Sequence, residues 1–102
     1  MKVHNKLVRD KIPEIIEAAG KQSVTHILSD EEYITALETK LNEEVSEYQE
    51  DKNIEEMADV LEVLQAICIA RGYTLDQLEE VRAKKAQERG GFNEKIFLEY
   101  VE

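Results

Sequence analysis

The sequence predicts an all-α protein, built as an antiparallel bundle of about four helices and completed by oligomerisation. Apolar residues recur at three- and four-residue intervals through the middle of the chain, which is the spacing of a helix face. Three helix-capping signals follow one another, and the four glycines fall at the ends of the predicted helices. A chain of 102 residues suffices for one core, so we expect a single domain spanning residues 1–102.

The first predicted helix runs from Lys11 to Ala19. Asp10 is its expected cap, and Gly20 ends it. Pro13 is tolerated in the first turn because no hydrogen bond of the helix is lost there. The next residues, Ser23 to Leu28, are partly β-branched and are expected to form a short extended stretch.

The second predicted helix begins at a capping box, in which Ser29 is followed three residues later by Glu32. It ends near Glu50, and residues 51–53 make the turn that follows. Its apolar face consists of Tyr33, Ile34, Leu37, Leu41, Val45 and Tyr48.

The third predicted helix starts at Asn53, with Glu56 completing a capping signal, and it runs to Arg71 before Gly72. Its side chains are apolar on almost every face, and such a helix is normally buried on almost every face. A domain of 102 residues rarely covers a helix in this way by itself. We therefore predict a homo-oligomer, a dimer or a tetramer, built on this helix.

A charged fourth helix is predicted from the capping pair Thr74 and Gln77 to Gly90 and Gly91. The tail from Phe92 to Val101 carries several apolar side chains. It is expected to be either an extended segment or a terminal turn docked on the helices.

The charge of the chain restricts its partners and its location. A net charge of −10 argues against nucleic acid or an anionic membrane as a general partner, because the field of the molecule repels both. The chain has no apolar run near the ~18 residues of a membrane span. Its single cysteine, Cys68, lies in an apolar helical run and is expected to be a small core residue. These features predict a cytoplasmic protein.

Four acidic residues lie where apolar side chains are expected. On the second helix Glu44 lies only about 60° from the centre of the apolar stripe, and Glu47 follows on the same flank. On the third helix Glu56 and Asp59 project among apolar residues. An unpaired carboxylate in such a place is either protonated or costly, so each of the four needs a partner.

The short turn between the two helices brings these acids to matching levels. Glu47 and Glu56 lie roughly 5 to 6 Å from the turn, and Glu44 and Asp59 lie roughly 9 to 10 Å from it. Four carboxylates therefore converge, and hard divalent cations prefer such oxygen ligands. We expect Mg²⁺, with Mn²⁺ as a substitute. The competing interpretation is that acidic pairs on helices are solvated faces without a metal, which holds for most single ExxE or ExxD patterns.

Three motifs in order resemble those of a known family. The segment from Lys40 to Glu47 (KLNEEVSE), followed by Glu56 to Asp59 (EMAD), is similar to the EExxE…ExxD signature of the all-α nucleotide pyrophosphohydrolases. This superfamily includes MazG, dimeric dUTPases and phosphoribosyl-ATP pyrophosphohydrolase. The opening Asn5 to Pro13 (NKLVRDKIP) and the late Arg89 to Phe92 (RGGF) resemble a compact MazG-like subgroup, often labelled phosphoribosyl-ATP pyrophosphohydrolase-like.

The resemblance implies Mg²⁺-dependent cleavage of a nucleoside triphosphate between its α and β phosphates, which gives a monophosphate and pyrophosphate. Glu44, Glu47, Glu56 and Asp59 fall on the metal-ligand positions of the family, and Glu43 falls on a further acidic position. The gap between the two acidic motifs is short, and no residues match a phosphoribosyl-recognition site. Both features argue against a role in histidine biosynthesis.

Phosphate groups also need direct donors, and basic residues gather in two parts of the chain. The expected substrate-binding residues are Lys6, Arg9, Lys11, Lys40, Arg89, Gly91 and Phe92. Lys84 and Lys85 also lie near the two glycines, and the alternative interpretation is that they neutralise the C-terminus of the fourth helix and that Gly90 is its C-cap. No GxxxxGK[ST] pattern is present, so a P-loop is excluded.

Three functions compete at this stage. The leading one is a metal-dependent nucleotide pyrophosphohydrolase, of the kind that removes unwanted triphosphates. The second is a metal-dependent nucleotide-binding or sensor module with little turnover. The third is a helical adaptor that assembles through the third helix and binds no metal.

Overall fold

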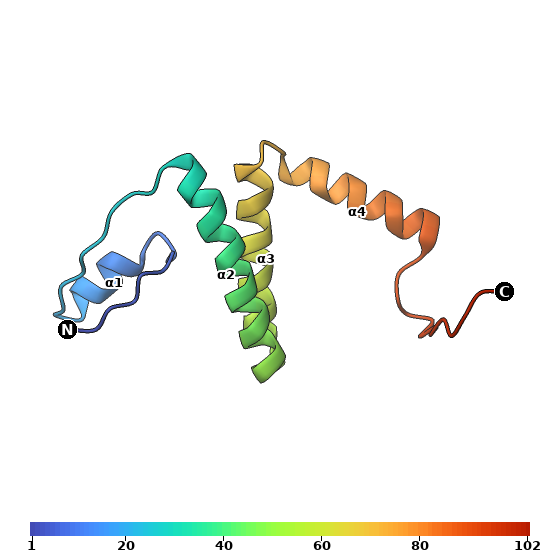
Figure 1. The fold of residues 1–102 in the computed structure, drawn as a ribbon, viewed down its shortest axis with the longest axis horizontal. Helices are drawn as coiled ribbons and strands as arrows, with labels where there is room; N and C mark the ends of the chain where they lie inside the picture. The colour runs from blue at the N-terminus through green and yellow to red at the C-terminus, as the bar shows by residue number, and fades with distance from the viewer.

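The computed structural model describes residues 1–102 and contains four α-helices and no strand. The helices are α1 (Ile12–Ala18), α2 (Asp30–Asp51), α3 (Ile54–Ala70) and α4 (Leu75–Arg89). α2 and α3 lie side by side and antiparallel, while α1 and α4 lie away from them on opposite sides (Figure 1). The prediction of an all-α chain with four helices is confirmed.

The three capping signals act as predicted. The Ser29 hydroxyl accepts a hydrogen bond from the Glu32 N–H at 3.2 Å, and Glu32 Oε1 accepts one from the Ser29 N–H at 3.0 Å. Thr74 and Gln77 form the same reciprocal pair at the start of α4. Such caps satisfy backbone donors that the first helical turn leaves free, which fixes where each helix begins.

The turn between α2 and α3 is tight and well supported. Lys52 adopts a left-handed backbone conformation with φ 57°, and its N–H donates to the carbonyl of Tyr48 at 2.8 Å. The Asn53 side chain accepts from the Glu56 N–H at 2.9 Å and caps α3. These bonds make α2 and α3 an antiparallel hairpin with fixed relative levels.

One expectation outside the hairpin is wrong. Lys11 is the N-cap of α1 and makes no side-chain cap hydrogen bond, so Asp10 does not cap this helix. Residues 23–28 lie in the segment between α1 and α2 and form neither a helix nor a paired strand. Pro13 does lie in the first turn of α1, as predicted.

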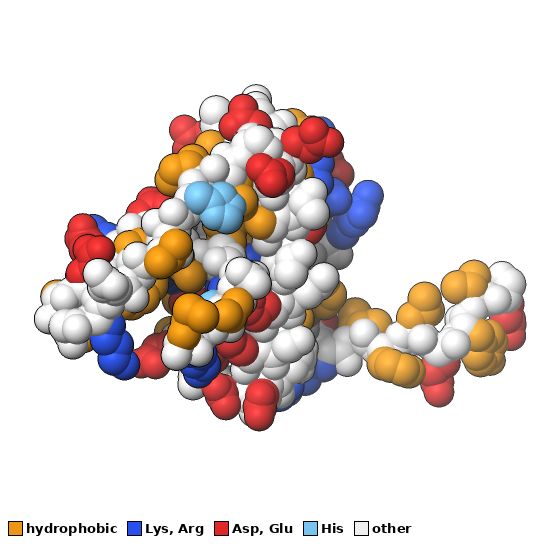
Figure 2. All heavy atoms as spheres, turned by 60° about the vertical axis from the view of Figure 1, so that its left-hand side comes forward, with side chains coloured by type: hydrophobic (Ala, Val, Ile, Leu, Met, Phe, Trp, Pro, Cys, Tyr) orange, Lys and Arg blue, Asp and Glu red, His pale blue; other side chains and the backbone are white.

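The tail after α4 is not docked on the helices. Residues 95–102 have no regular secondary structure, and the side chains of Phe92 and Phe97 are 97% and 88% exposed. In Figure 2 this tail projects from the body and carries a row of apolar side chains. The alternative of a docked terminal turn is therefore wrong for a single chain.

The core of one chain is small and lies between α2 and α3. Leu37, Val63 and Cys68 are its buried apolar residues. α3 is covered on one side only, and Ile54, Leu61 and Ile69 on its other faces are 76%, 54% and 59% exposed. One chain therefore does not bury α3 on nearly every face. None of the helices combines the length and the hydropathy that crossing a bilayer requires.

Leu37 is the most buried apolar residue, at 3% exposure, so its truncation tests the hairpin core. We expect Leu37→Ala to lower the free energy of unfolding by about 2 to 4 kcal/mol, because the deletion leaves a cavity between α2 and α3. Urea unfolding at one fixed protein concentration measures the change. Thr39→Ala, on the exposed side of α2, is the control and should stay within about 0.5 kcal/mol of the wild type. Equal effects of the two substitutions would contradict this core.

Candidate metal centre

Five carboxylates meet along one side of the α2–α3 hairpin. Oxygen atoms of Glu44, Glu56 and Asp59 lie within 4.8 Å of one another, and so do oxygen atoms of Glu43, Glu44 and Glu47. Glu44 belongs to both groups, so the two triplets form one cluster, which we call the acidic cluster. The structure thus brings together all four residues that the spacing predicted to converge, and adds Glu43.

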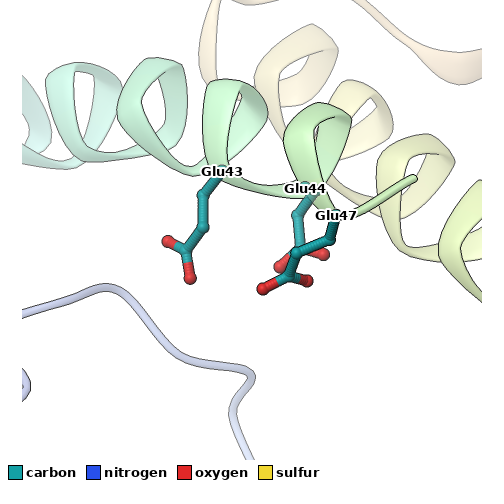
Figure 3. A group of neighbouring side chains, drawn as sticks. All are labelled: Glu43, Glu44 and Glu47. Carbon is teal, nitrogen blue, oxygen red and sulfur yellow. The ribbon is translucent and has the colours of Figure 1, made fainter. Parts of the chain in front are cut away.

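Helix geometry explains this convergence. Residues three apart share a helix face, so α2 presents Glu44 and Glu47 together and α3 presents Glu56 and Asp59 together. In Figure 3 the side chains of Glu43, Glu44 and Glu47 leave α2 on the same side, toward the N-terminal segment of the chain. The tight turn at Lys52 then sets the α3 pair opposite the α2 pair.

Glu44 is the buried centre of the cluster. It is only 7% exposed, and its Oε2 atom is buried without a hydrogen-bond partner. The Oε2 atom of Glu56 is also buried and also lacks a hydrogen-bond partner. A buried acceptor without a donor costs free energy, and the carboxylates of the cluster also repel one another. A cation held by these carboxyl groups would supply the missing positive charge, so the donor set fits a hard divalent ion.

Crowding of like charges changes two pKa values. The pKa of Glu47 is raised, first by a hydrogen bond shared with the Glu44 carboxyl group and then by the negative charge of Glu44. The pKa of Glu56 is raised, first by removal of its carboxylate from water and then by the charge of Asp59. Both shifts mean that the cluster holds protons more tightly than separate carboxylates would.

Three basic side chains offset part of this charge. Lys40 Nζ lies 3.5 Å from Glu43 Oε1 and 3.3 Å from Glu44 Oε1. From the N-terminal segment, Lys6 Nζ lies 3.6 Å from Glu43 Oε1, and Arg9 Nη2 donates to Asp59 Oδ1 at 2.6 Å. The sequence identified these cations as phosphate donors and missed their pairing with the acids. Only the pairs of Lys40 carry a sequence signal, because they have the spacing of i,i+3 and i,i+4 helical pairs.

A cavity of about 490 Å³ lies beside the cluster, between the N-terminal segment and α2. Lys6, Lys40 and Glu43 line the part that the cavity shares with the acidic cluster. Thr35 and Thr39 add hydroxyl groups further along α2. The volume is within the range of small-ligand sites.

Other predicted substrate-binding residues do not reach the cluster within one chain. Arg89, Gly91 and Phe92 lie at the outer end of α4 and just beyond it, and α4 leads away from the hairpin (Figure 1). Lys11 is exposed and forms no ion pair. The single chain therefore joins the acids only with Lys6, Arg9 and Lys40.

The raised pKa of Glu56 predicts the pH dependence of stability. The folded protein keeps a proton on Glu56 at pH values where the unfolded chain, with a value near 4.5, has released it. Without divalent cations, the free energy of unfolding should therefore fall as the pH rises from about 4.5 through the folded pKa. Glu56→Gln should remove this part of the decline, and it should be more stable than the wild type at pH 7 but not at pH 4.

Urea unfolding in a metal chelator at several pH values measures the profile. Glu62→Gln, on an exposed position of α3, is the matched control and should follow the wild type. A Glu56→Gln protein that is less stable than the wild type at pH 7 would contradict the expected sign.

Comparison with known proteins gives one partial match. No family model matches the chain, and no solved structure matches it. An uncharacterised protein of Mycolicibacterium smegmatis is 58% identical to it over 41 residues, which are 40% of this chain and 42% of that protein. The matched part thus covers less than half of either protein, and it establishes a related segment without an activity.

Proposed function

We propose that this protein is a Mg²⁺-dependent nucleoside triphosphate pyrophosphohydrolase, which cleaves between the α and β phosphates and releases a monophosphate and pyrophosphate. One observation carries the proposal: Glu44 is more than nine-tenths buried with an unpartnered Oε2 atom, and its carboxyl group lies in a cluster with those of Glu47, Glu56 and Asp59. The resemblance of the acidic motifs to the EExxE…ExxD signature supports the same reaction. Removal of unwanted triphosphates is the role we assign to it.

The exposure of each carboxylate decides whether we assign it to metal binding or to activation of the attacking water. Glu44, Glu56 and Asp59 are buried or half-buried and would hold the metal ion. When bound, Mg²⁺ supplies charge neutralisation for the phosphate oxygens and the leaving pyrophosphate. Glu47 is the exposed member of the cluster, so it can reach water. Its raised pKa suits a group that orients the attacking water and accepts a proton from it.

The cavity beside α2 is the proposed site of the nucleotide. Its cationic end, with Lys6 and Lys40, adjoins the acidic cluster, so the phosphates belong there. Its other end contains Glu31 and Glu32, whose charge repels phosphate. The nucleoside would therefore point toward Thr35, with the triphosphate directed at the metal.

Pyrophosphate release from a panel of nucleoside triphosphates with Mg²⁺ tests the reaction. We expect turnover that a chelator abolishes and that Glu56→Gln and Asp59→Asn lower by more than about 100-fold, because each removes a proposed metal ligand. Glu62→Gln is the control and should retain wild-type turnover. Product analysis must show the monophosphate. Tight nucleotide binding without turnover would instead favour a sensor module, and equal activity of all variants would contradict the metal centre.

We also propose that the chain works as a homo-oligomer with an even number of copies, in which α3 is buried. In one chain several apolar residues of α3 and the tail remain exposed, namely Ile54, Met57, Leu61, Leu64, Ile69, Phe92, Ile96, Phe97 and Leu98. Exposed apolar side chains in such number, on α3 and separately on the tail, are typical of surfaces that a partner covers. A second copy that covers the exposed faces of α3 would complete the helix bundle.

Sedimentation equilibrium of the purified chain tests the assembly. We expect a mass of two or four times 11.8 kDa. Leu61→Glu, at a 54% exposed position of α3, should shift the equilibrium toward the monomer because it places a charge in the buried interface. Glu62→Gln, at the adjacent polar position, should leave the mass unchanged. A wild-type mass of 11.8 kDa would contradict the proposal.

A further inference from the structure

The N-terminal arm, residues 1–11, is attached to the helical hairpin through the acidic cluster itself. Its ion pairs with the helices are Lys6 with Glu43 on α2, at 3.6 Å, and Arg9 with Asp59 on α3, at 2.6 Å. The next element, α1, makes no close backbone approach to any other helix. The two ion pairs thus join the arm to both helices of the hairpin.

The Asp59 carboxylate binds Arg9, and it is also a proposed ligand of the metal ion. Asp59 Oδ1 accepts from Arg9 Nη2, while a carboxylate oxygen of Asp59 lies within 4.8 Å of oxygens from Glu44 and Glu56. Arg9 therefore supplies positive charge at a carboxylate that a metal ion would also use. Meanwhile the buried Oε2 atoms of Glu44 and Glu56 remain without any donor. The arm neutralises the outer part of the cluster and leaves its interior open to a cation.

The ion pair between Arg9 and Asp59 can be broken at little cost in free energy. The side chains of Arg9 and Asp59 are 57% and 37% exposed, and solvent-exposed ion pairs contribute little to stability. A guanidinium group binds carboxylate and phosphate with the same planar fork of donors, so Arg9 has an alternative partner of equal geometry in a triphosphate. The cavity reaches the arm at Asn5, Lys6 and Leu7, and Arg9 follows two residues later on the same arm.

We propose that Arg9 is a positioning residue that couples metal binding to nucleotide binding. In the free protein Arg9 neutralises Asp59 and so competes with the metal ion for it. When the nucleotide binds, its phosphate takes over Arg9, and Asp59 is released to the metal. This inference rests on the proposed function for the identity of the ligand, while the competition between Arg9 and the metal ion requires only that a metal binds.

The competition is tested by titrating Mn²⁺ alone into the purified 102-residue chain and measuring the dissociation constant of Mn²⁺ by electron paramagnetic resonance. We expect Arg9→Gln to bind Mn²⁺ about two- to fivefold more tightly than the wild type, because the competing cation is gone. Lys2→Gln removes the same charge from an exposed arm position that forms no ion pair, and it should bind Mn²⁺ as the wild type does. Mn²⁺ should also increase hydrogen exchange of the arm in the wild type. Unchanged or weaker Mn²⁺ binding by Arg9→Gln, or no Mn²⁺ binding at all, overturns the inference.

The coupling is tested by steady-state kinetics with the nucleotide that the panel identifies. Arg9→Gln should need less Mg²⁺ for half-maximal activity and more nucleotide, so that the two requirements move in opposite directions. A merely structural role of Arg9 would worsen both, and that result overturns the inference. If no nucleotide is cleaved, the proposed function fails while the Mn²⁺ comparison still decides the competition. If cleavage is found and Mn²⁺ binds both proteins equally, only the role of Arg9 fails.

Discussion

The repulsion between carboxylates at the α2–α3 seam is the constraint on which the arrangement of the molecule depends. Glu44 is buried against Glu56, and neither Oε2 atom has a donor. Positive charge near the seam offsets part of this repulsion. Lys40 supplies some of it from the same helix, and Arg9 supplies more from a distant part of the chain. What remains unpaired is the interior of the cluster, which is where a divalent ion would have the largest effect.

The helices could be predicted from sequence because their ends are determined locally. Ser29 with Glu32 and Thr74 with Gln77 form their bonds within four residues, so they act before any tertiary contact exists. The cap of α1 was missed because Lys11 takes the cap position without a side-chain bond, and no local signal marks it. The convergence of the acids was also predictable, since a tight turn leaves little freedom in the relative levels of two adjacent helices.

The contacts of the arm could not be predicted in the same way. Arg9 and Asp59 are 50 positions apart, and nothing in their neighbourhoods indicates that they meet. The position of the tail from Phe92 onward could not be predicted either, because the spacing of apolar residues does not identify the surface that covers them. The nearly uniform apolar character of α3 predicted burial on every side, whereas in one chain α2 packs along one side of it, α4 makes only a few contacts with it, and its other faces stay exposed. The contacts of the arm, the position of the tail and the burial of α3 all depend on residues far away in the sequence or on other copies of the chain.

The left-handed turn at Lys52 has a consequence for how this sequence can vary. Loops usually accept insertions and deletions at little cost. Here the residues between Glu47 and Glu56 act as a fixed spacer, and removing one residue from the end of α2 would rotate the acidic face by about 100° relative to the turn. Substitutions in this spacer are therefore tolerable, while changes in its length would disassemble the cluster. Homologous chains that retain the chemistry should differ there in residue type far more than in residue number.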